Sequence, residues 1–261
     1  MRFGLSNRPR ARVTLWAAVA VLYCLITAVV AHAGPPFFTD DPVPVPYRNW
    51  ELYAATQDVK EQGGKSGTAP HFEANYGALP ELQLHMIVPL AWDRPQGEST
   101  QYGLGDLEVG AKYRFIHEGK VMPQVGAFPI LTLPTGDDER GLGEGRANLF
   151  LPVWLQKSWG RWTSYGGGGY WIHPGEDNQN YWFTGVVLQR QITDWLALGG
   201  ELFQSTADTV DGGDSTGYNF GAMIDFSEEQ HLLISGGSDL HGDTDLTFYL
   251  AYQLTFGPPV K

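Results

Sequence analysis

The sequence predicts an all-β protein: an up-and-down antiparallel transmembrane β-barrel of about 12 strands. Three observations support this prediction. Glycine (33 residues) and proline (17 residues) recur along the chain and disfavour long helices. Segments of roughly 10 to 13 residues alternate apolar and polar side chains, the pattern of a membrane-spanning strand. The links between these segments are alternately short and long, as in barrels with tight turns at one end and loops at the other.

The first 33 residues predict a cleaved secretory signal peptide. Four arginines precede the apolar run 15–30, which ends in Ala-His-Ala at 31–33. A retained membrane anchor is the alternative, but this run is shorter than the roughly 20 residues of a spanning helix. Cleavage removes Cys24, the only cysteine. It also removes four positive charges, so the formal charge falls from −12 to −16 and no nucleic-acid partner is expected.

Residues 34–47 form a proline-rich segment, expected to be an extended periplasmic leader that pairs with no strand. The barrel is expected over 48–256, followed by a short tail, 257–261. Within the barrel we expect strands at 48–58, 68–78, 81–91, 104–116, 121–133, 147–157, 161–172, 180–190, 194–204, 217–227, 230–238 and 245–256.

The links between the predicted strands assign the two ends of the barrel. Tight joints such as "ALPE", "SWGR" and "QITD" alternate with longer polar ones such as "VKEQGGKSG", "PTGDDERGLGEGR" and "GSDLHGDT". Because outer-membrane barrels have short periplasmic turns and long external loops, we expect both termini on the periplasmic side. The six long, acidic loops then lie outside.

The direction of the apolar face separates a membrane barrel from a soluble one. In "GDLEVGAKYRF" (105–115), charged and apolar residues occupy opposite faces, and 71–76, 82–90, 218–226 and 246–256 repeat the pattern. Twelve apolar faces turned inward would leave a large dry cavity, whereas turned outward they match a bilayer. Tryptophans near strand ends fit the aromatic girdles of such barrels. The facing of the sixth to ninth strands stays open, because aromatics lie on both faces.

The inward face supplies the candidate pore-lining residues: Glu73, His85, Asp106, Glu108, Lys112, Arg114, Glu201 and Asp225. These charges could line a path for solutes, or they could pair with one another and fill the lumen. Twelve strands lie between the eight that fill with side chains and the sixteen that leave an aqueous channel, so both outcomes stay open. The four glycines 166–169 predict a close approach, which the leader could make from inside the barrel.

Several segments resemble a known family. "PFFTDDP", "PHFEANYGALPELQLHMIVPLAW", "YGLGDLEVGAKYRF" and "LTLPTGDDERGLGEG" are similar to the outer-membrane family named after the meta-pathway of phenol degradation, whose members are described as transporters. The resemblance implies a bacterial outer-membrane barrel that passes aromatic or other small apolar nutrients. One departure is that "GPPVK" follows the terminal aromatic pattern of the last strand, where such barrels commonly end.

The function expected from these observations is passive uptake of small solutes across the outer membrane of a Gram-negative bacterium. The alternative is a closed or narrow barrel with a structural role in the envelope. A lipid-modifying enzyme is less favoured, because no nucleophile motif such as G-x-S-x-G occurs. No catalytic residue and no cofactor are expected. No metal site is expected either, since the acidic loops lack the EF-hand spacing of a calcium site. The expected partners are membrane lipid, lipopolysaccharide, the barrel-assembly machinery and a small-molecule solute.

Overall fold

The computed structural model describes residues 36–259, so the predicted signal peptide lies outside the described residues. The strands are β1 (Trp50–Glu61), β2 (Gly64–Leu79), β3 (Leu82–Pro95), β4 (Gln101–Leu104), β5 (Leu107–Ile116), β6 (Gln124–Ala127), β7 (Ile130–Leu133), β8 (Asn148–Trp159), β9 (Trp162–Ile172), β10 (Tyr181–Thr193), β11 (Leu196–Ser205), β12 (Ser215–Asp225), β13 (Gln230–His241) and β14 (Thr244–Phe256). One 3₁₀ turn, Asp138–Arg140, lies in a loop.

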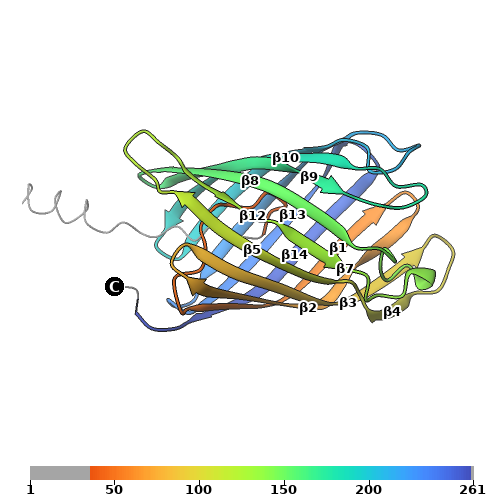
Figure 1. Cartoon of the computed structure of the whole chain (residues 1–261), viewed down its shortest axis with the longest axis horizontal. Coiled ribbons are helices and arrows are strands. Elements are labelled where there is room, and N and C mark those ends of the chain that lie inside the picture. The colour runs from red at the N-terminus through yellow and green to blue at the C-terminus, as the bar shows by residue number, and fades with distance from the viewer. Residues whose placement is uncertain (1–35, 260–261) are drawn as a thin grey trace, which may run out of the picture. The chain divides into compact units, whose positions relative to one another are not determined.

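These segments form a closed barrel of twelve antiparallel strands, which confirms the predicted fold class (Figure 1). Segments β4 and β5 both pair with β3 and make one strand that is interrupted at Gly105. Segments β6 and β7 both pair with β8 and make another, interrupted before Ile130. Pro129 lies in that second gap and has no N–H to donate to the ladder. The pairing of β1 with β14 leaves no free edge, as a bilayer requires.

Two of the links expected to be long are tight turns instead. Val59 pairs with Ser66 and Glu61 with Gly64, so the hairpin of β1 and β2 continues almost to its tip. Strands β13 and β14 likewise extend to His241 and Thr244. The prediction of six long loops was therefore wrong, because polar residues at a strand end can continue the ladder beyond the bilayer. Longer loops remain at 134–147, 173–180 and 206–214, and at the opposite end the link 117–123 between β5 and β6 is longer than the tight joint expected there.

Side chains face as the alternation predicted, with polar residues inward and apolar residues outward. On β12, Asn219 is 3 % exposed whereas its neighbour Phe220 is 70 % exposed. On β14, Thr247, Ala251 and Gln253 are buried, whereas Leu246 and Tyr252 are exposed. An apolar outer surface around a polar interior is the arrangement that a bilayer selects. Among residues 36–259, no helix is long and apolar enough to cross a membrane.

The four strands whose facing was left open, β8 to β11, turn aromatic side chains into the barrel. Those that point inward are Phe150, Trp154, Tyr165, Trp171, Phe183 and Phe203. Trp154, which is 1 % exposed, and Trp171 belong to this inner wall and not to an aromatic girdle, although both were expected among the tryptophans near strand ends. Trp50, Trp159 and Trp195 are exposed near the end of the barrel that carries the short turns, as girdle residues would be.

Candidate functional site

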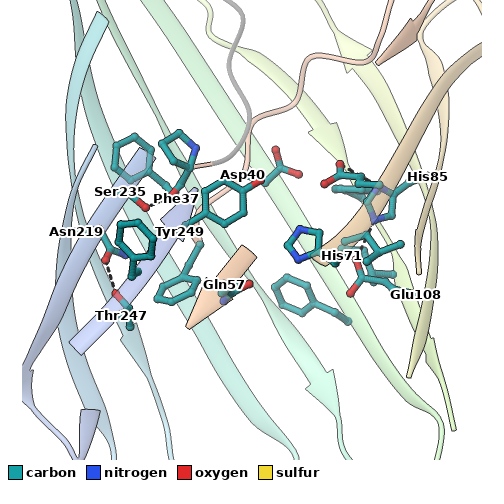
Figure 2. A pocket seen from close by; sticks show the side chains of 18 of the residues that line it. Phe37, Asp40, Gln57, His71, His85, Glu108, Asn219, Ser235, Thr247 and Tyr249 are labelled. Carbon is teal, nitrogen blue, oxygen red and sulfur yellow. Dashed lines mark hydrogen bonds and ion pairs between the residues drawn. The ribbon is translucent and has the colours of Figure 1, made fainter. Parts of the chain in front are cut away.

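The proline-rich leader crosses the inside of the barrel. Near its start, the Ser235 hydroxyl on β13 donates a hydrogen bond to the Pro36 carbonyl. Further along, the Val45 N–H donates to Gln83 on β3, at 2.9 Å. Strands β13 and β3 are not neighbours in the sheet, so residues 36–45 run between separate parts of the wall (Figure 2). The leader therefore occupies the lumen over its described part.

Glu201 on β11 holds the middle of the leader. Its carboxylate accepts hydrogen bonds from the N–H groups of Phe38 at 3.2 Å and Thr39 at 2.6 Å, and from the Asn219 amide at 2.7 Å. The Glu201 side chain is 2 % exposed, and no basic side chain pairs with it in the part of the chain that the structure describes. A buried carboxylate is stable only when hydrogen bonds replace its hydration, so the leader and Glu201 depend on each other.

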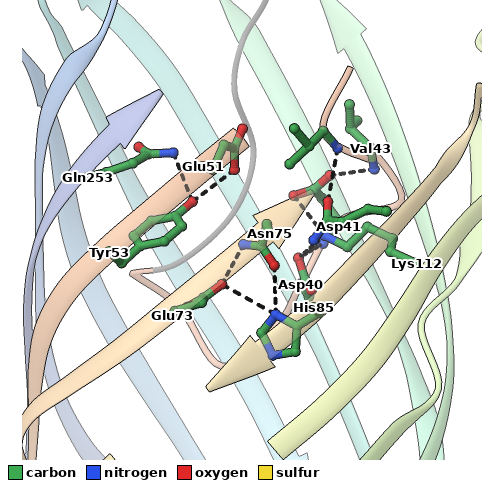
Figure 3. A network of polar contacts seen from close by, with 12 residues as sticks. Asp40, Asp41, Val43, Glu51, Tyr53, Glu73, Asn75, His85, Lys112 and Gln253 are labelled. Carbon is green, nitrogen blue, oxygen red and sulfur yellow. Dashed lines mark hydrogen bonds and ion pairs between the residues drawn. The ribbon is translucent and has the colours of Figure 1, made fainter. Parts of the chain in front are cut away.

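Lys112 on β5 holds the leader at a second point. Its ammonium lies 2.9 Å from Asp40 Oδ1 and 3.9 Å from Asp41 Oδ2, and it lies over the Phe128 ring at 4.9 Å (Figure 3). Asp41 also accepts the Val43 N–H at 2.6 Å. Burial raises the pKa of the Asp41 carboxyl to about 7, against the opposing attraction of Lys112.

His85 on β3 lies between two carboxylates. Its Nε2 is 2.9 Å from Glu108 on β5, and its Nδ1 is 2.7 Å from the Asn75 Oδ1 and 3.5 Å from Glu73. The Asn75 amide donates to Glu73 at 2.6 Å, which ties the group together. Lys112 and His85 are thus each shared between two acids: Figure 3 shows Lys112 with Asp40 and Asp41 and His85 with Glu73, and Figure 2 shows His85 beside Glu108.

The other three predicted pore residues lie in separate contacts. Asp106 accepts the N–H groups of Gly136 and Glu144 and so holds the loop 134–147. Arg114 donates to Glu81 at 2.6 Å near the short-turn end of the barrel, and Asp225 is 2.6 Å from His231. The structure thus brings Glu73, His85, Glu108 and Lys112 together with the leader, places Glu201 on another part of the wall, and keeps these three apart.

A cavity of about 200 Å³ lies between the leader and the wall. One side carries His71, Glu73, His85 and Glu108, and Figure 2 shows Tyr249, Asn219 and Thr247 across from them. Aromatic rings complete its lining: Phe37 and Phe38 of the leader, with Phe128, Phe150 and Trp154 of the wall. Among the described residues, the Tyr249 hydroxyl and the Trp154 indole N–H have no hydrogen-bond partner. These two groups are buried, so the cavity offers a ring-shaped solute apolar faces together with the partly exposed Glu108 carboxylate.

The aromatic wall and the anchors of the leader were not predicted from the sequence. A Cβ at Gly167 or Gly169 would lie 3.1 Å from the Trp154 ring or 2.7 Å from the Phe150 ring, so these glycines make room for the wall. The leader packs elsewhere: a Cβ at Gly185 would collide with Thr39, and one at Gly221 would lie 2.9 Å from Phe37. The glycines signalled a close approach, but the suggestion that the leader makes it at 166–169 was wrong.

Comparison with known proteins supports both the fold and the family resemblance. The model of the family described as "Putative MetA-pathway of phenol degradation" matches residues 68–254, more than half of the chain. The COG4313 outer membrane channel from Pseudomonas putida F1 superposes with a TM-score of 0.68 at 17 % identity, over 86 % of this chain and 100 % of that one.

Two porins share the barrel fold more distantly. The NanC porin gives a TM-score of 0.55 at 8 % identity, over 80 % of this chain and 100 % of its own. The KdgM porin in complex with disordered oligogalacturonate gives 0.53 at 9 % identity, over 80 % and 99 %. A search of curated protein sequences gave no match. At these identities the structural likenesses establish the outer-membrane barrel fold.

Proposed function

Because the chain belongs to this MetA-pathway family of phenol degradation, we propose that it is an outer-membrane channel for passive uptake of small solutes, single-ring aromatic compounds among them. The barrel would reach the outer membrane of a Gram-negative bacterium after export by its signal peptide and insertion by the barrel-assembly machinery. Its acidic external loops would meet lipopolysaccharide, and divalent cations would bridge the two. No catalytic role is assigned to it.

The observation that carries this proposal is the cavity beside the leader. Its volume of about 200 Å³ exceeds the roughly 150 Å³ of an apolar cavity that binds benzene. Aromatic rings from the leader and the wall surround it, and they would stack on a planar solute. A pore for hydrated ions alone would not require an aromatic lining.

The leader is the element that would set the rate of passage. It fills the lumen from β13 to β3: backbone N–H groups of the leader donate hydrogen bonds to Glu201 and Gln83, and its Pro36 carbonyl accepts one from Ser235. A solute larger than a water molecule would therefore pass only beside the leader or after its displacement. We expect the intact protein to show a small unit conductance.

Removal of the leader tests whether it occludes a pore. We expect a variant that lacks residues 35–46 to show larger single-channel conductance in a planar bilayer than the full chain, because the lumen of a twelve-stranded barrel is then open. Heat-modifiable migration on a gel confirms that both proteins are folded. Equal conductance in two folded proteins would show that the leader does not limit the pore.

Uptake of an aromatic compound tests the substrate class. Cells with and without the protein would be given a panel of labelled single-ring compounds at limiting concentration, and initial uptake would be measured. We expect faster uptake with the protein for aromatic members of the panel and no difference for a sugar of similar size. The same initial rates across the whole panel would contradict the aromatic assignment.

A closed barrel with a structural role is the second candidate, and one observation favours it. All eight predicted pore residues are engaged in ion pairs or hydrogen bonds within the protein, as expected of charges that stabilise a filled lumen. In this case neither the intact protein nor the leader deletion would conduct, and loss of the protein would raise the sensitivity of cells to detergents.

A further inference from the structure

We propose that the luminal cavity selects by charge: it accepts ring compounds that are neutral or positively charged and rejects ring compounds that carry an anionic group. This inference deepens the proposed function and rests on it for the route of the solute. It is carried by the placement of acids and bases around the leader, which is independent of the size or the aromatic lining of the cavity.

The first step is the balance of charge around the leader. Three bases, Lys112, His85 and His71, lie among the described residues around the leader and its cavity, whereas the acids are Asp40, Asp41, Glu73, Glu108 and Glu201. Lys112 and His85 each contact two of these acids, His71 contacts Thr68, and Glu201 has no ion pair with any of the three bases. Even with Asp41 protonated, since burial raises its pKa to about 7, the acids outnumber the bases by four to three.

The second step is the availability of each group to a solute. An anionic solute would need a positively charged side chain to pair with, but the Lys112 ammonium is already enclosed by Asp40, Asp41 and the Phe128 ring. The His85 ring presents both nitrogens to acceptors of its own protein. By contrast, Glu108 has about a quarter of its side chain exposed and lines the cavity, so one carboxylate is open to a solute cation.

The third step is the aromatic lining. A cation near the face of Phe, Tyr or Trp is attracted by the ring, and the attraction grows when water is excluded. Phe128, Phe150, Trp154 and Tyr249 all line the cavity. Rings and carboxylates therefore favour a cation together, whereas an anion meets repulsion from the acids and no attraction from the rings.

The test uses two probes that share a ring and differ in fixed charge, benzyltrimethylammonium and benzenesulfonate. Binding of each to the full-length refolded protein would be measured by calorimetry in a nonionic detergent. We expect the cation to bind about fivefold more tightly than the anion. In planar bilayers with a KCl gradient, the reversal potential should correspond to a K⁺ over Cl⁻ permeability ratio of about five.

The matched variants keep shape and change charge. Glu73→Gln with Glu108→Gln removes the two acids that flank His85, and we expect the preference for the cation to fall below about twofold. Glu98→Gln with Glu229→Gln removes two exposed acids at the ends of the barrel and should leave the preference unchanged. If the first pair does not fold, Glu108→Gln alone, at the more exposed position, should show a smaller fall in the same direction.

The outcomes separate this inference from the proposed function. Equal or tighter binding of benzenesulfonate, or an unchanged preference in the folded Glu73 and Glu108 variant, would overturn the charge selection. Preferential binding of the cation without any current, in the full chain and in the leader deletion alike, would support the charge selection and overturn the channel.

Discussion

At the residue scale, Glu201 makes the contact on which docking of the leader to the barrel depends most. Its carboxylate is the acceptor for two consecutive backbone N–H groups of the leader, and Thr39 is fully buried, so no water can replace the carboxylate there. Glu201→Ala should therefore weaken docking of the leader by about 1 to 3 kcal/mol for each donor left unpaired. We expect faster proteolysis at residues 36–41 and a larger conductance. Glu98→Ala, which removes an exposed carboxylate, is the control and should change neither.

Asp41 makes docking of the leader depend on pH. Burial raises its pKa from the ordinary 3.8 to about 7, so the docked leader holds a proton that the undocked leader releases. Docking is therefore strongest at low pH and weakens as pH rises from about 4 to about 7. We expect more proteolysis of the leader and higher conductance at pH 8 than at pH 5. Asp41→Asn keeps an acceptor for the Val43 N–H and should abolish this difference; a pH response that persists in the variant would assign it to another group.

At the scale of elements, β8 and β9 approach each other closely at Gly169. A Cβ at Gly169 would lie 2.5 Å from the Pro152 Cα and 2.7 Å from the Phe150 ring, so the strands approach too closely for a larger residue. Gly169→Ala should cost about 1 to 3 kcal/mol of folding free energy and lower the urea concentration at which the barrel unfolds. The control is Gly200→Ala on β11, where the added Cβ would meet Phe220 at an ordinary 3.4 Å. Equal midpoints for the two variants would contradict this account.

The strands also show what a sequence can predict. Where one face is charged and the other apolar, as in β5 and β12, alternation gives both the strand and its facing. In β8 to β11 the alternation predicts the strand but not its facing, because an aromatic ring packs equally well against lipid and in an aromatic lumen. The predicted ends of β1 and β13 lie before the observed ones, since polar residues beyond the bilayer can continue to pair with the neighbouring strand.

At the scale of the whole molecule, closure and the inside-out distribution of polarity follow from local patterns, but the route of the leader does not. Its contacts join residues far apart in the sequence, such as Thr39 with Glu201 and Pro36 with Ser235. These contacts use backbone groups of the leader, which every residue carries, so no pattern of side chains in the sequence predicts them. The candidate pore residues could be named from strand parity, whereas the cavity beside them depended on where the leader lies.

The outward apolar surface predicts how stability varies with depth in the membrane. Phe220 lies at the middle of β12 and is 70 % exposed, whereas Phe226 lies just beyond the end of that strand and is also exposed. Phe220→Arg would place a charge near the centre of the bilayer and should cost about 2 to 4 kcal/mol, whereas Phe226→Arg near the interface should cost about 0 to 1 kcal/mol. Equilibrium refolding into lipid vesicles measures both. A soluble barrel would show the same small cost for the two substitutions, because each would face water, and that result would contradict the membrane assignment.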